Sequence, residues 1–358
     1  MKKINHIHGG KLYSEVLEEG LRYIDDRMNG RIRSFKTPWA GLNRAGIGGL
    51  EWGSLLTLGA RPGSGKTLIV TQMLRESRTL NPHQDFNILE FQFEMGSKQT
   101  ASRAFAAHTA LDYNVVLSTE RQLDQFSRNA MADYAADTRA LEQVGIYRVN
   151  INKPLTSPEI RNAVYHYYDE LGSKPLVVTI DHSWLIKKDV TEKEKIATLY
   201  NATEMLMQLK NELPIIVMMI TQLNRTIDEP SRKVPGSVAN YPTSSDIFGG
   251  DALMQGSDMV VALNRPSLFN VNVYGPKGYL TKDDDIFAHL IKVRNGSDDN
   301  KLLFMKAEFK RQRMIEVTEP NASNPSGNGF VRLSQRQAPT SQQRNNTAPH
   351  SLDTDIDI

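Results

Sequence analysis

Short apolar runs alternate with longer amphipathic stretches along the chain, and this pattern predicts strands separated by helices. Apolar runs bounded by polar or turn-forming residues are typical of buried strands. They lie at residues 55–58, 86–93, 146–149, 176–180, 215–220, 259–263, 286–293 and 302–307. Helical spacing covers most of residues 97–143, and it recurs at 156–171 and 191–212. Strands that alternate with helices predict an α/β fold with a mainly parallel, twisted sheet and helices on both faces.

The two ends of the chain differ from this pattern. Residues 11–28 have apolar side chains at helical spacing and are followed by a basic connector, so we expect residues 1–36 to form a linker helix and connector. The helix either packs on its own domain or reaches a neighbouring one. Residues 37–318 are expected to form one domain. Residues 319–358, rich in Asn, Ser, Gln and Pro and acidic at 353–358, predict a disordered tail.

Composition removes several classes of protein from consideration. The 358 residues contain no cysteine, which excludes disulfides and thiolate metal sites. No apolar run approaches the roughly 20 residues of a membrane helix, and the N-terminus has no apolar signal region, so we expect a cytoplasmic protein. A net charge of +2 does not by itself indicate nucleic-acid binding. Any contact with DNA must therefore come from local patches.

The first core strand leads into a glycine-rich turn that opens a helix, which is the context of a phosphate-binding P-loop. Glycines let successive backbone N–H groups turn toward phosphate oxygens, beside the positive end of the helix. Lys66 is expected to reach the β- and γ-phosphates, and Thr67 to offer its hydroxyl to Mg²⁺. Ala60 stands where the pattern has its first glycine. The predicted ATP-binding residues are Ala60, Arg61, Pro62, Gly63, Ser64, Gly65, Lys66 and Thr67.

Three polar residues follow predicted strands, at the edge where open α/β sheets bind ligands. Asp181 suits an Mg²⁺ ligand, and Glu94 suits a group that polarises the attacking water. Gln222 is placed to sense the γ-phosphate and to relay its loss to the following segment, residues 226–250, whose Ser, Pro, Gly and Asp content predicts a mobile loop. A carboxylate at a strand end can instead simply cap the next helix.

Five segments, taken in order, resemble the motifs of DnaB-type replicative helicases. Gly-Ala-Arg-Pro-Gly-Ser-Gly-Lys-Thr at 59–67 is similar to the P-loop of that family, alanine included, and Phe-Gln-Phe-Glu-Met at 91–95 to its catalytic-glutamate strand. Thr-Ile-Asp-His at 179–182 resembles its Walker B strand. Thr-Gln-Leu-Asn-Arg at 221–225 and Lys-Val-Arg-Asn-Gly at 292–296 resemble two later motifs. The resemblance spans residues 37–317 and implies a RecA-like P-loop NTPase fold.

The same resemblance implies a homo-oligomeric ring, expected to be a hexamer, that moves 5′→3′ on single-stranded DNA and hydrolyses ATP with Mg²⁺ between subunits. It gives Lys292 and Arg294 the role of a finger pair that reaches the γ-phosphate of the neighbouring subunit. Two cations at positions i and i+2 of a strand can point at one anion. Without the resemblance, the pair would be interpreted as a solvated basic strand. The N-terminal helix becomes a linker docked on an adjacent protomer, and primase, polymerase or a loader becomes an expected partner.

The sequence also departs from that family. We expect a phage-like form without the large N-terminal domain of the family. Phe248 stands where the family has an arginine in an Arg-Glu-Ser-Gly loop that touches the DNA backbone. The remaining DNA-binding candidates are Arg232 and Lys233, which fit an ordinary solvated loop equally well, and the backbone amides of Gly249 and Gly250.

Two other functions compete with the helicase. One is a RecA-like recombination or repair ATPase that forms filaments on single-stranded DNA. The other is a non-motor scaffold that binds ATP and DNA as a static ring. The Phe-Glu-Met strand and the Lys-Val-Arg-Asn-Gly segment favour the helicase over the recombinase. Glu94 argues against the scaffold, because a scaffold has no need of a hydrolytic base.

Overall fold

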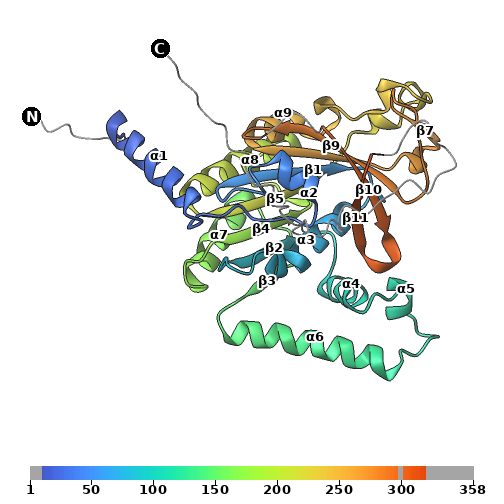
Figure 1. Cartoon of the computed structure of the whole chain (residues 1–358), viewed down its shortest axis with the longest axis horizontal. Helices are drawn as coiled ribbons and strands as arrows, with labels where there is room; N and C mark the ends of the chain where they lie inside the picture. The colour runs from blue at the N-terminus through green and yellow to red at the C-terminus, as the bar shows by residue number, and fades with distance from the viewer. Residues whose placement is uncertain (1–9, 297–300, 320–358) are drawn as a thin grey trace, which may run out of the picture.

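The computed structural model describes residues 10–296 and 301–319, and it is built around one nine-stranded sheet (Figure 1). The strand order is β11-β10-β9-β6-β1-β5-β4-β2-β3. The six strands from β6 to β3 are parallel to one another. Beyond β6, each of β9, β10 and β11 pairs antiparallel with the preceding strand. The strands are β1 Ser54–Ala60, β2 Asn87–Gln92, β3 Arg148–Ile151, β4 Leu176–Asp181, β5 Ile215–Gln222, β6 Met259–Asn264, β9 Asp285–Val293, β10 Leu302–Glu308 and β11 Arg313–Val317. The predicted fold class is confirmed.

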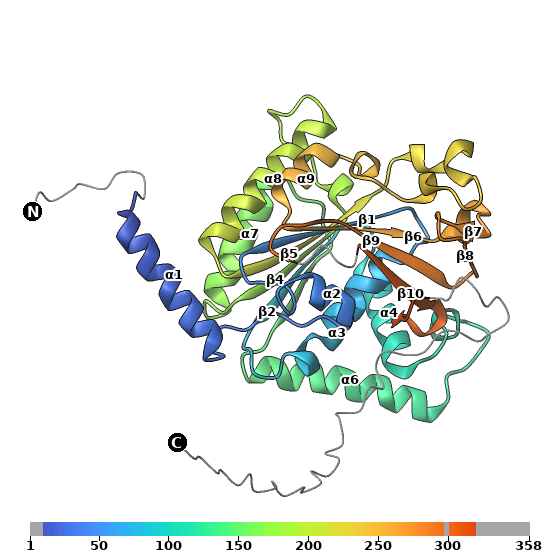
Figure 2. The same cartoon turned by 45° about the horizontal axis from the view of Figure 1, so that its top comes forward.

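Helices cover both faces of the sheet (Figure 2). On one face, α2 and α3 pack in a core with alternate residues of β5 such as Ile216 and Met218. On the other, α7, α8 and α9 pack in a second core with Ile215 and Val217. Because both faces are buried, the central strands are apolar throughout instead of alternating with polar residues. The helices are α1 Tyr13–Met28, α2 Ala40–Ala45, α3 Lys66–Leu80, α4 Ser97–Thr109, α5 Tyr113–Val116, α6 Gln125–Gln143, α7 Ser157–Glu170, α8 Lys195–Glu212 and α9 Gly250–Gly256.

Helix α1 projects away from the body of the molecule in both views (Figures 1 and 2), and none of its residues is buried. Its apolar side chains, among them Tyr13, Leu17 and Leu21, are exposed. Its C-terminal end is held by Arg27, whose guanidinium lies 2.8 Å from the Glu51 carboxylate. The sequence left two positions open for this helix, on its own domain or reaching a neighbouring one. The structure does not show α1 packed along its own domain.

Several predicted elements differ from those observed. The short strand expected at 146–149 is β3 at Arg148–Ile151, and the helix expected from residue 191 begins at Lys195. The segment predicted to be a mobile loop after β5 is instead an ordered run of 3₁₀ turns: η2 Arg225–Asp228, η3 Pro230–Lys233, η4 Val238–Asn240 and η5 Ser244–Asp246. The predicted disordered tail and its acidic tip lie outside the described residues, apart from Glu319.

Small elements connect the later strands. A two-stranded sheet joins β7 Val273–Tyr274 to β8 Tyr279–Leu280, and it packs with Phe287 and Phe304 in a third, smaller core. Further 3₁₀ turns lie at η1 Ser183–Leu185, η6 Pro266–Phe269 and η7 Phe309–Arg311. Turns η1 and η6 begin shortly after parallel strands end, so they lie at the same edge of the sheet as the P-loop.

Candidate nucleotide site and its surroundings

The P-loop links β1 to α3 in the geometry that the sequence predicts. Gly63 and Gly65 have φ of +79° and +86°, which L side chains rarely adopt. A Cβ at Gly65 would also lie 2.9 Å from Met314 Cε, so the end of that side chain would have to shift. Lys66 begins α3, is only 8% exposed and donates from Nζ to the Ala60 carbonyl at 3.2 Å. Arg61 and Pro62 lead into this turn.

The alanine at the pattern's first glycine has a local explanation. Ala60 is fully buried as the last residue of β1, where it pairs with Gln222, and it has an ordinary φ. Close packing is required one residue earlier, because a Cβ at Gly59 would lie 2.7 Å from Ile247 Cδ1. The glycine is therefore needed at Gly59, and a methyl group is accommodated at Ala60.

Buried polar atoms at the P-loop have unused hydrogen-bonding capacity. Ser64 Oγ has no partner among the described residues. Burial lowers the pKa of the Lys66 ammonium, and the carboxylates of Glu94 and Asp181 oppose that shift. An ammonium that burial disfavours, beside a buried hydroxyl without a partner, is a site that gains from an anion.

Asp181 ends β4 and faces the start of α3. Its Oδ2 accepts hydrogen bonds from Thr67 Oγ1 at 3.1 Å and from Gln92 Nε2 at 3.4 Å. Its Oδ1 is buried and has no partner among the described residues. Burial, followed by the nearby Glu94 charge, raises the pKa of Asp181 to about 6, although the hydrogen bonds from Thr67 and Gln92 lower it. A bound divalent cation would reverse this shift.

These oxygens fit Mg²⁺. The ion prefers carboxylate, hydroxyl and phosphate oxygens, and the free Oδ1 of Asp181 adjoins the Thr67 hydroxyl at the foot of the P-loop. No cluster of three or more His, Asp or Glu side chains suited to a metal occurs in the described part of the chain. Substrate phosphates and water would therefore have to complete the coordination.

Glu94 lies just after β2, with its side chain about half exposed. Its Oε2 lies 3.9 Å from His182 Nε2. His182 is itself buried, and burial lowers its pKa, so its ring is neutral at physiological pH. Glu94 is thus the solvent-facing carboxylate of the site, whereas Asp181 is the buried one. A water-polarising role for the exposed carboxylate and a metal-binding role for the buried one stay predictions.

Gln222 lies at the end of β5, between the P-loop strand β1 and the Asp181 strand β4. It pairs in register with Ala60, and its backbone carbonyl accepts a hydrogen bond from Phe248 N at 3.0 Å. Its side chain makes no hydrogen bond with the described residues. Arg61 turns toward the same strand end, where its guanidinium bonds the Leu223 carbonyl at 3.2 Å and the Asp228 carboxylate at 2.7 Å.

Sequence reasoning missed one pair beside the P-loop. Arg265 donates to the Gly63 carbonyl at 3.1 Å, and its guanidinium lies 4.4 Å from the centre of the Phe309 ring. A signal was available, since Arg265 follows β6 directly and parallel strands bring their carboxyl ends to one edge. Phe309 had no such signal, because the sequence does not show that β10 runs in the same direction as β6. That direction follows from the antiparallel pairing of β10 with β9 and of β9 with β6.

The structure does not bring Lys292 and Arg294 to the P-loop of their own chain. Strand β9 runs antiparallel to β6, so Val293 pairs with Met259 at the beginning of β6, the edge opposite the P-loop. There Lys292 Nζ donates to the carbonyls of Met254 and Gln255, and Arg294 lies 3.1 Å from Asp258 Oδ1. The two cations do lie together, at the C-terminal end of α9.

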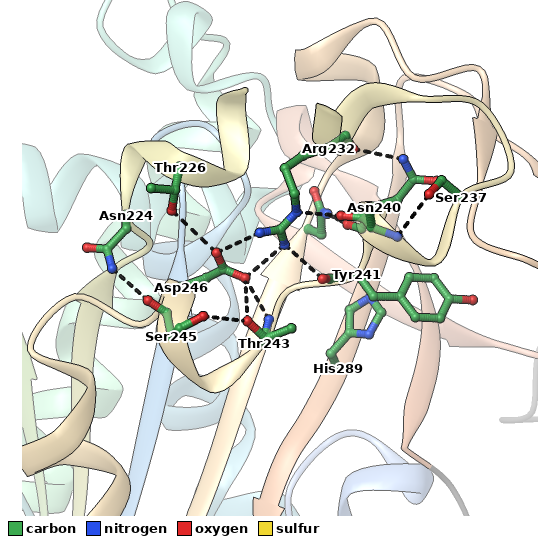
Figure 3. Close-up of polar contacts among 12 residues, drawn as sticks. Asn224, Thr226, Arg232, Ser237, Asn240, Tyr241, Thr243, Ser245, Asp246 and His289 are labelled. Atoms are coloured by element: carbon green, nitrogen blue, oxygen red, sulfur yellow. Dashed lines mark hydrogen bonds and ion pairs between the residues drawn. The ribbon is translucent and has the colours of Figure 1, made fainter. Parts of the chain in front are cut away.

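The DNA-binding candidates lie in or beside the segment after β5, and Figure 3 shows one of them, Arg232. The Arg232 guanidinium forms a two-pronged ion pair with Asp246 at 2.8 and 2.9 Å, and it also donates to the carbonyls of Ala239 and Tyr241. This arginine is occupied inside its own loop, which favours a structural role over a phosphate contact. Lys233 Nζ lies 5.9 Å from the Phe269 ring. Gly249 and Gly250 form the start of α9.

A buried network continues from this loop to β9. Asn240 bonds the carbonyls of Arg232 and Val234, and Asn264 bonds the Asn240 carbonyl and the Tyr274 hydroxyl. That hydroxyl lies 2.8 Å from His289 Nε2. Burial lowers the pKa of His289 to about 3, so its imidazole is neutral at physiological pH. The segment after β5 is thus fastened to the sheet by polar contacts.

In the described part of the chain, no helix is both long and apolar enough to cross a membrane.

The chain is 23% identical over 265 residues to the replicative DNA helicase DnaB of Haemophilus influenzae, covering 74% of this chain and 52% of that protein. It is 25% identical over 269 residues to the DnaB of Helicobacter pylori strain J99, covering 74% and 51%. The chain thus spans about half the length of the curated relatives it matches.

Two solved structures share the fold. An isolated ATPase domain superposes with a TM-score of 0.66 at 14% identity, covering 84% of this chain and 99% of that one. A DnaB-like replicative helicase, solved in a study of its interactions with primase, gives 0.66 at 15% identity, covering 85% and 66%. Residues 35–313 match the family described as DnaB-like helicase C terminal domain. This chain therefore belongs to the DnaB-like helicase C-terminal domain family.

Proposed function

We propose that this chain is the ATP-hydrolysing motor of a DNA helicase that moves on single-stranded DNA during replication. The observation that carries the proposal is the set of open polar atoms where the P-loop meets Asp181, in a member of this family. A buried carboxylate oxygen and a buried hydroxyl without partners cost folding free energy unless a ligand satisfies them. A nucleotide triphosphate with Mg²⁺ is the ligand that fits this donor and acceptor set.

Each residue at this edge has a separate task in hydrolysis. The P-loop amides and Lys66 hold and orient the phosphates, and Thr67 and Asp181 hold Mg²⁺. When bound, the ion neutralises charge that develops on the transferring phosphoryl group. Glu94 accepts a proton from the attacking water, because its half-exposed side chain is within reach of solvent. Gln222 contacts the γ-phosphate side of the site.

The pair formed by Arg265 and Phe309 supports the proposal on the side away from Asp181. A guanidinium over a ring, next to Gly63 of the P-loop, offers flat faces beside the phosphate site. A purine base bound through its phosphates at the P-loop would reach such faces, where stacking and cation–π contacts are available.

The site requires a neighbouring subunit. Lys292 and Arg294 lie at the edge of the sheet opposite their own P-loop, so they can act as γ-phosphate ligands only in another copy of the chain. We propose a ring, most simply a hexamer, in which each nucleotide lies between two subunits. The exposed apolar face of α1 then docks on the adjacent protomer.

Partners and location follow from the proposed motor. The DNA strand is the polymer on which the ring moves, with a 5′→3′ direction as the expected polarity. Primase, a polymerase or a loader are candidate partners, and a related structure was solved in a study of interactions with primase. The site of action would be the cytoplasm of a bacterial or phage-infected cell.

A forked-DNA unwinding assay tests the proposal. The substrates carry either a 5′ or a 3′ single-stranded tail, and Lys66→Ala serves as the inactive control. ATP-dependent separation of the 5′-tailed fork alone would support a helicase of the proposed polarity. DNA-stimulated ATP hydrolysis without strand separation on either fork would contradict the helicase and favour a filament-forming recombination ATPase.

A further inference from the structure

Two aromatic side chains form a partly exposed pair beside Gln222, and none of the roles above uses them. The rings of Trp184 and Phe248 meet edge to face, with centroids 4.6 Å apart. Together with Gln222, Arg61 and Arg225, both rings line one pocket. Trp184 is 42% exposed, which is unusual for the largest apolar side chain unless it has a partner to meet.

The backbone holds this aromatic pair firmly, although its members lie far apart in sequence. Trp184 belongs to η1, and Ser183 Oγ donates to Thr221 Oγ1 at 3.0 Å. Phe248 N donates to the Gln222 carbonyl at 3.0 Å, and Thr221 Oγ1 lies 3.3 Å from the Phe248 carbonyl. The two rings therefore extend from neighbouring strand ends in a fixed arrangement, which lowers the entropic cost of binding.

Positive charge surrounds the aromatic pair. Lys195 Nζ lies 5.6 Å from the centre of the Trp184 ring. Arg225 is exposed and makes no side-chain hydrogen bond or ion pair with the described residues. Aromatic faces bordered by cations are the combination that binds single-stranded nucleic acid, because rings stack on bases while cations attract phosphates. An apolar peptide would use the rings but would gain nothing from the cations.

We propose that Trp184 and Phe248 form a stacking platform for unpaired bases of the DNA strand on which the motor moves. The inference rests on the proposed function and specifies how the strand is held. Phe248 occupies the position at which the resemblance leads one to expect an arginine on the DNA backbone. A phenylalanine cannot bind phosphate, so this chain replaces a charge contact with a base contact at that position.

The platform is also connected to the nucleotide site. The Phe248 backbone is hydrogen-bonded to Gln222, whose strand pairs with the P-loop strand at Ala60. A base that shifts Phe248 therefore pulls directly on the residue placed beside the γ-phosphate.

Binding to two strands of equal length and charge tests the platform. One is an oligo(dT), and the other carries abasic sites in place of the bases. The full chain with a non-hydrolysable ATP analogue should bind oligo(dT) about tenfold more tightly, since stacking on aromatic side chains is worth about 1–3 kcal/mol per base. The variants Trp184→Ala and Phe248→Ala should lose that preference while keeping their affinity for the abasic strand. Phe126→Ala, which removes an 83% exposed ring on α6, is the matched control.

The outcomes separate this inference from the proposed function. Equal binding of the two strands by the unmodified chain, or a preference that survives in Phe248→Ala, would overturn the platform and leave the motor intact. Failure to bind either strand would overturn the proposed function and the platform with it. Should Phe248→Ala not fold, Phe248→Leu keeps an apolar side chain of similar size without a π face, and it should likewise lose the base preference.

Discussion

Two polar clusters of this molecule use their buried groups in opposite ways. Around the P-loop, Ser64 Oγ and Asp181 Oδ1 are buried without partners among the described residues. In the segment after β5, the ion pair of Arg232 and Asp246 is saturated, because each Asp246 oxygen accepts at least two hydrogen bonds (Figure 3). We call this ion pair with its backbone contacts the loop clamp.

The two clusters differ in whether their buried polar atoms have partners, and this difference indicates which of them binds a ligand. An unmet buried polar atom costs about 1–3 kcal/mol, and a chain retains that cost where a bound group supplies the missing partner. A saturated ion pair has no capacity left for a ligand, and its contribution is to fix a loop. On this basis we propose that the P-loop cluster binds nucleotide, whereas the clamp holds the segment that carries Phe248.

We call the polar groups at the P-loop, Ser64, Lys66, Thr67 and Asp181, the open cluster. The largest expected effect comes from removing its cation, Lys66. Lys66→Ala should lower ATP turnover about a thousandfold, because the variant loses a preorganised positive charge beside the phosphoryl group on which negative charge develops. The nucleotide-free variant should be at least as stable as the unmodified chain, because burial lowers the Lys66 pKa and so disfavours its charge. Steady-state hydrolysis and thermal unfolding measure the two effects. Normal turnover would refute the assignment of the P-loop.

Breaking the loop clamp should lower the stability of the fold. Arg232→Ala leaves the Asp246 carboxylate, whose side chain is 2% exposed, without its counter-charge, so we expect a loss of about 3–4 kcal/mol in unfolding free energy. The exposed Arg225→Ala should change stability by less than about 0.5 kcal/mol. Chemical denaturation compares the two variants. Equal stability would show that the clamp contributes no more than a surface arginine.

Replacing Asp181 should stabilise the chain at neutral pH, whereas replacing Arg232 should destabilise it. Its pKa is about 6 in the folded chain against 3.8 in the reference state, so the folded state binds more protons between these values. Stability therefore falls as pH rises through that window. Asp181→Asn should raise the unfolding free energy by about 2–3 kcal/mol at pH 7.5 and by nothing below pH 4. The variant should also lose stabilisation by Mg²⁺ with nucleotide. A destabilised variant at pH 7.5 would contradict this interpretation of the open cluster.

The smallest effect lies within the clamp. Thr243 donates to Asp246 from its backbone N–H at 2.7 Å and from its hydroxyl at 3.0 Å. Thr243→Ala removes the hydroxyl, and with it the bond to Asp246 and the 2.9 Å contact with Ser245 Oγ, so a loss of about 1 kcal/mol is expected. Thr243→Ser, which keeps the hydroxyl, serves as the control and should be close to the unmodified chain in the same denaturation assay.

Local signals allowed much of the open cluster to be predicted from sequence. The P-loop glycines need a conformation that is visible in the residue type, and Asp181 directly follows a β-branched run. Both signals come from neighbouring residues, so they survive without knowledge of the fold. The sheet order then brought Asp181 to Thr67, as expected of parallel strands.

The clamp and the aromatic pair could not be predicted in this way. The composition of the segment after β5 suggests a mobile loop, yet Arg232 and Asp246, 14 residues apart, find each other without any periodic pattern. Trp184 and Phe248 meet only because β4 and β5 are neighbours in the sheet. Pairing between distant side chains depends on the three-dimensional arrangement, which residue type and spacing do not encode.

The central claim is that the open cluster is completed by a second copy of the chain. Two variants test it, Glu94→Ala, which removes the proposed base, and Arg294→Ala, which removes the proposed finger while sparing nucleotide binding. Each alone should be nearly inactive. ATP turnover measured in co-assembled mixtures should recover, because some interfaces then pair an intact Glu94 with an intact Arg294. Mixtures that assemble together yet show no more turnover than either variant alone would contradict a site shared between subunits.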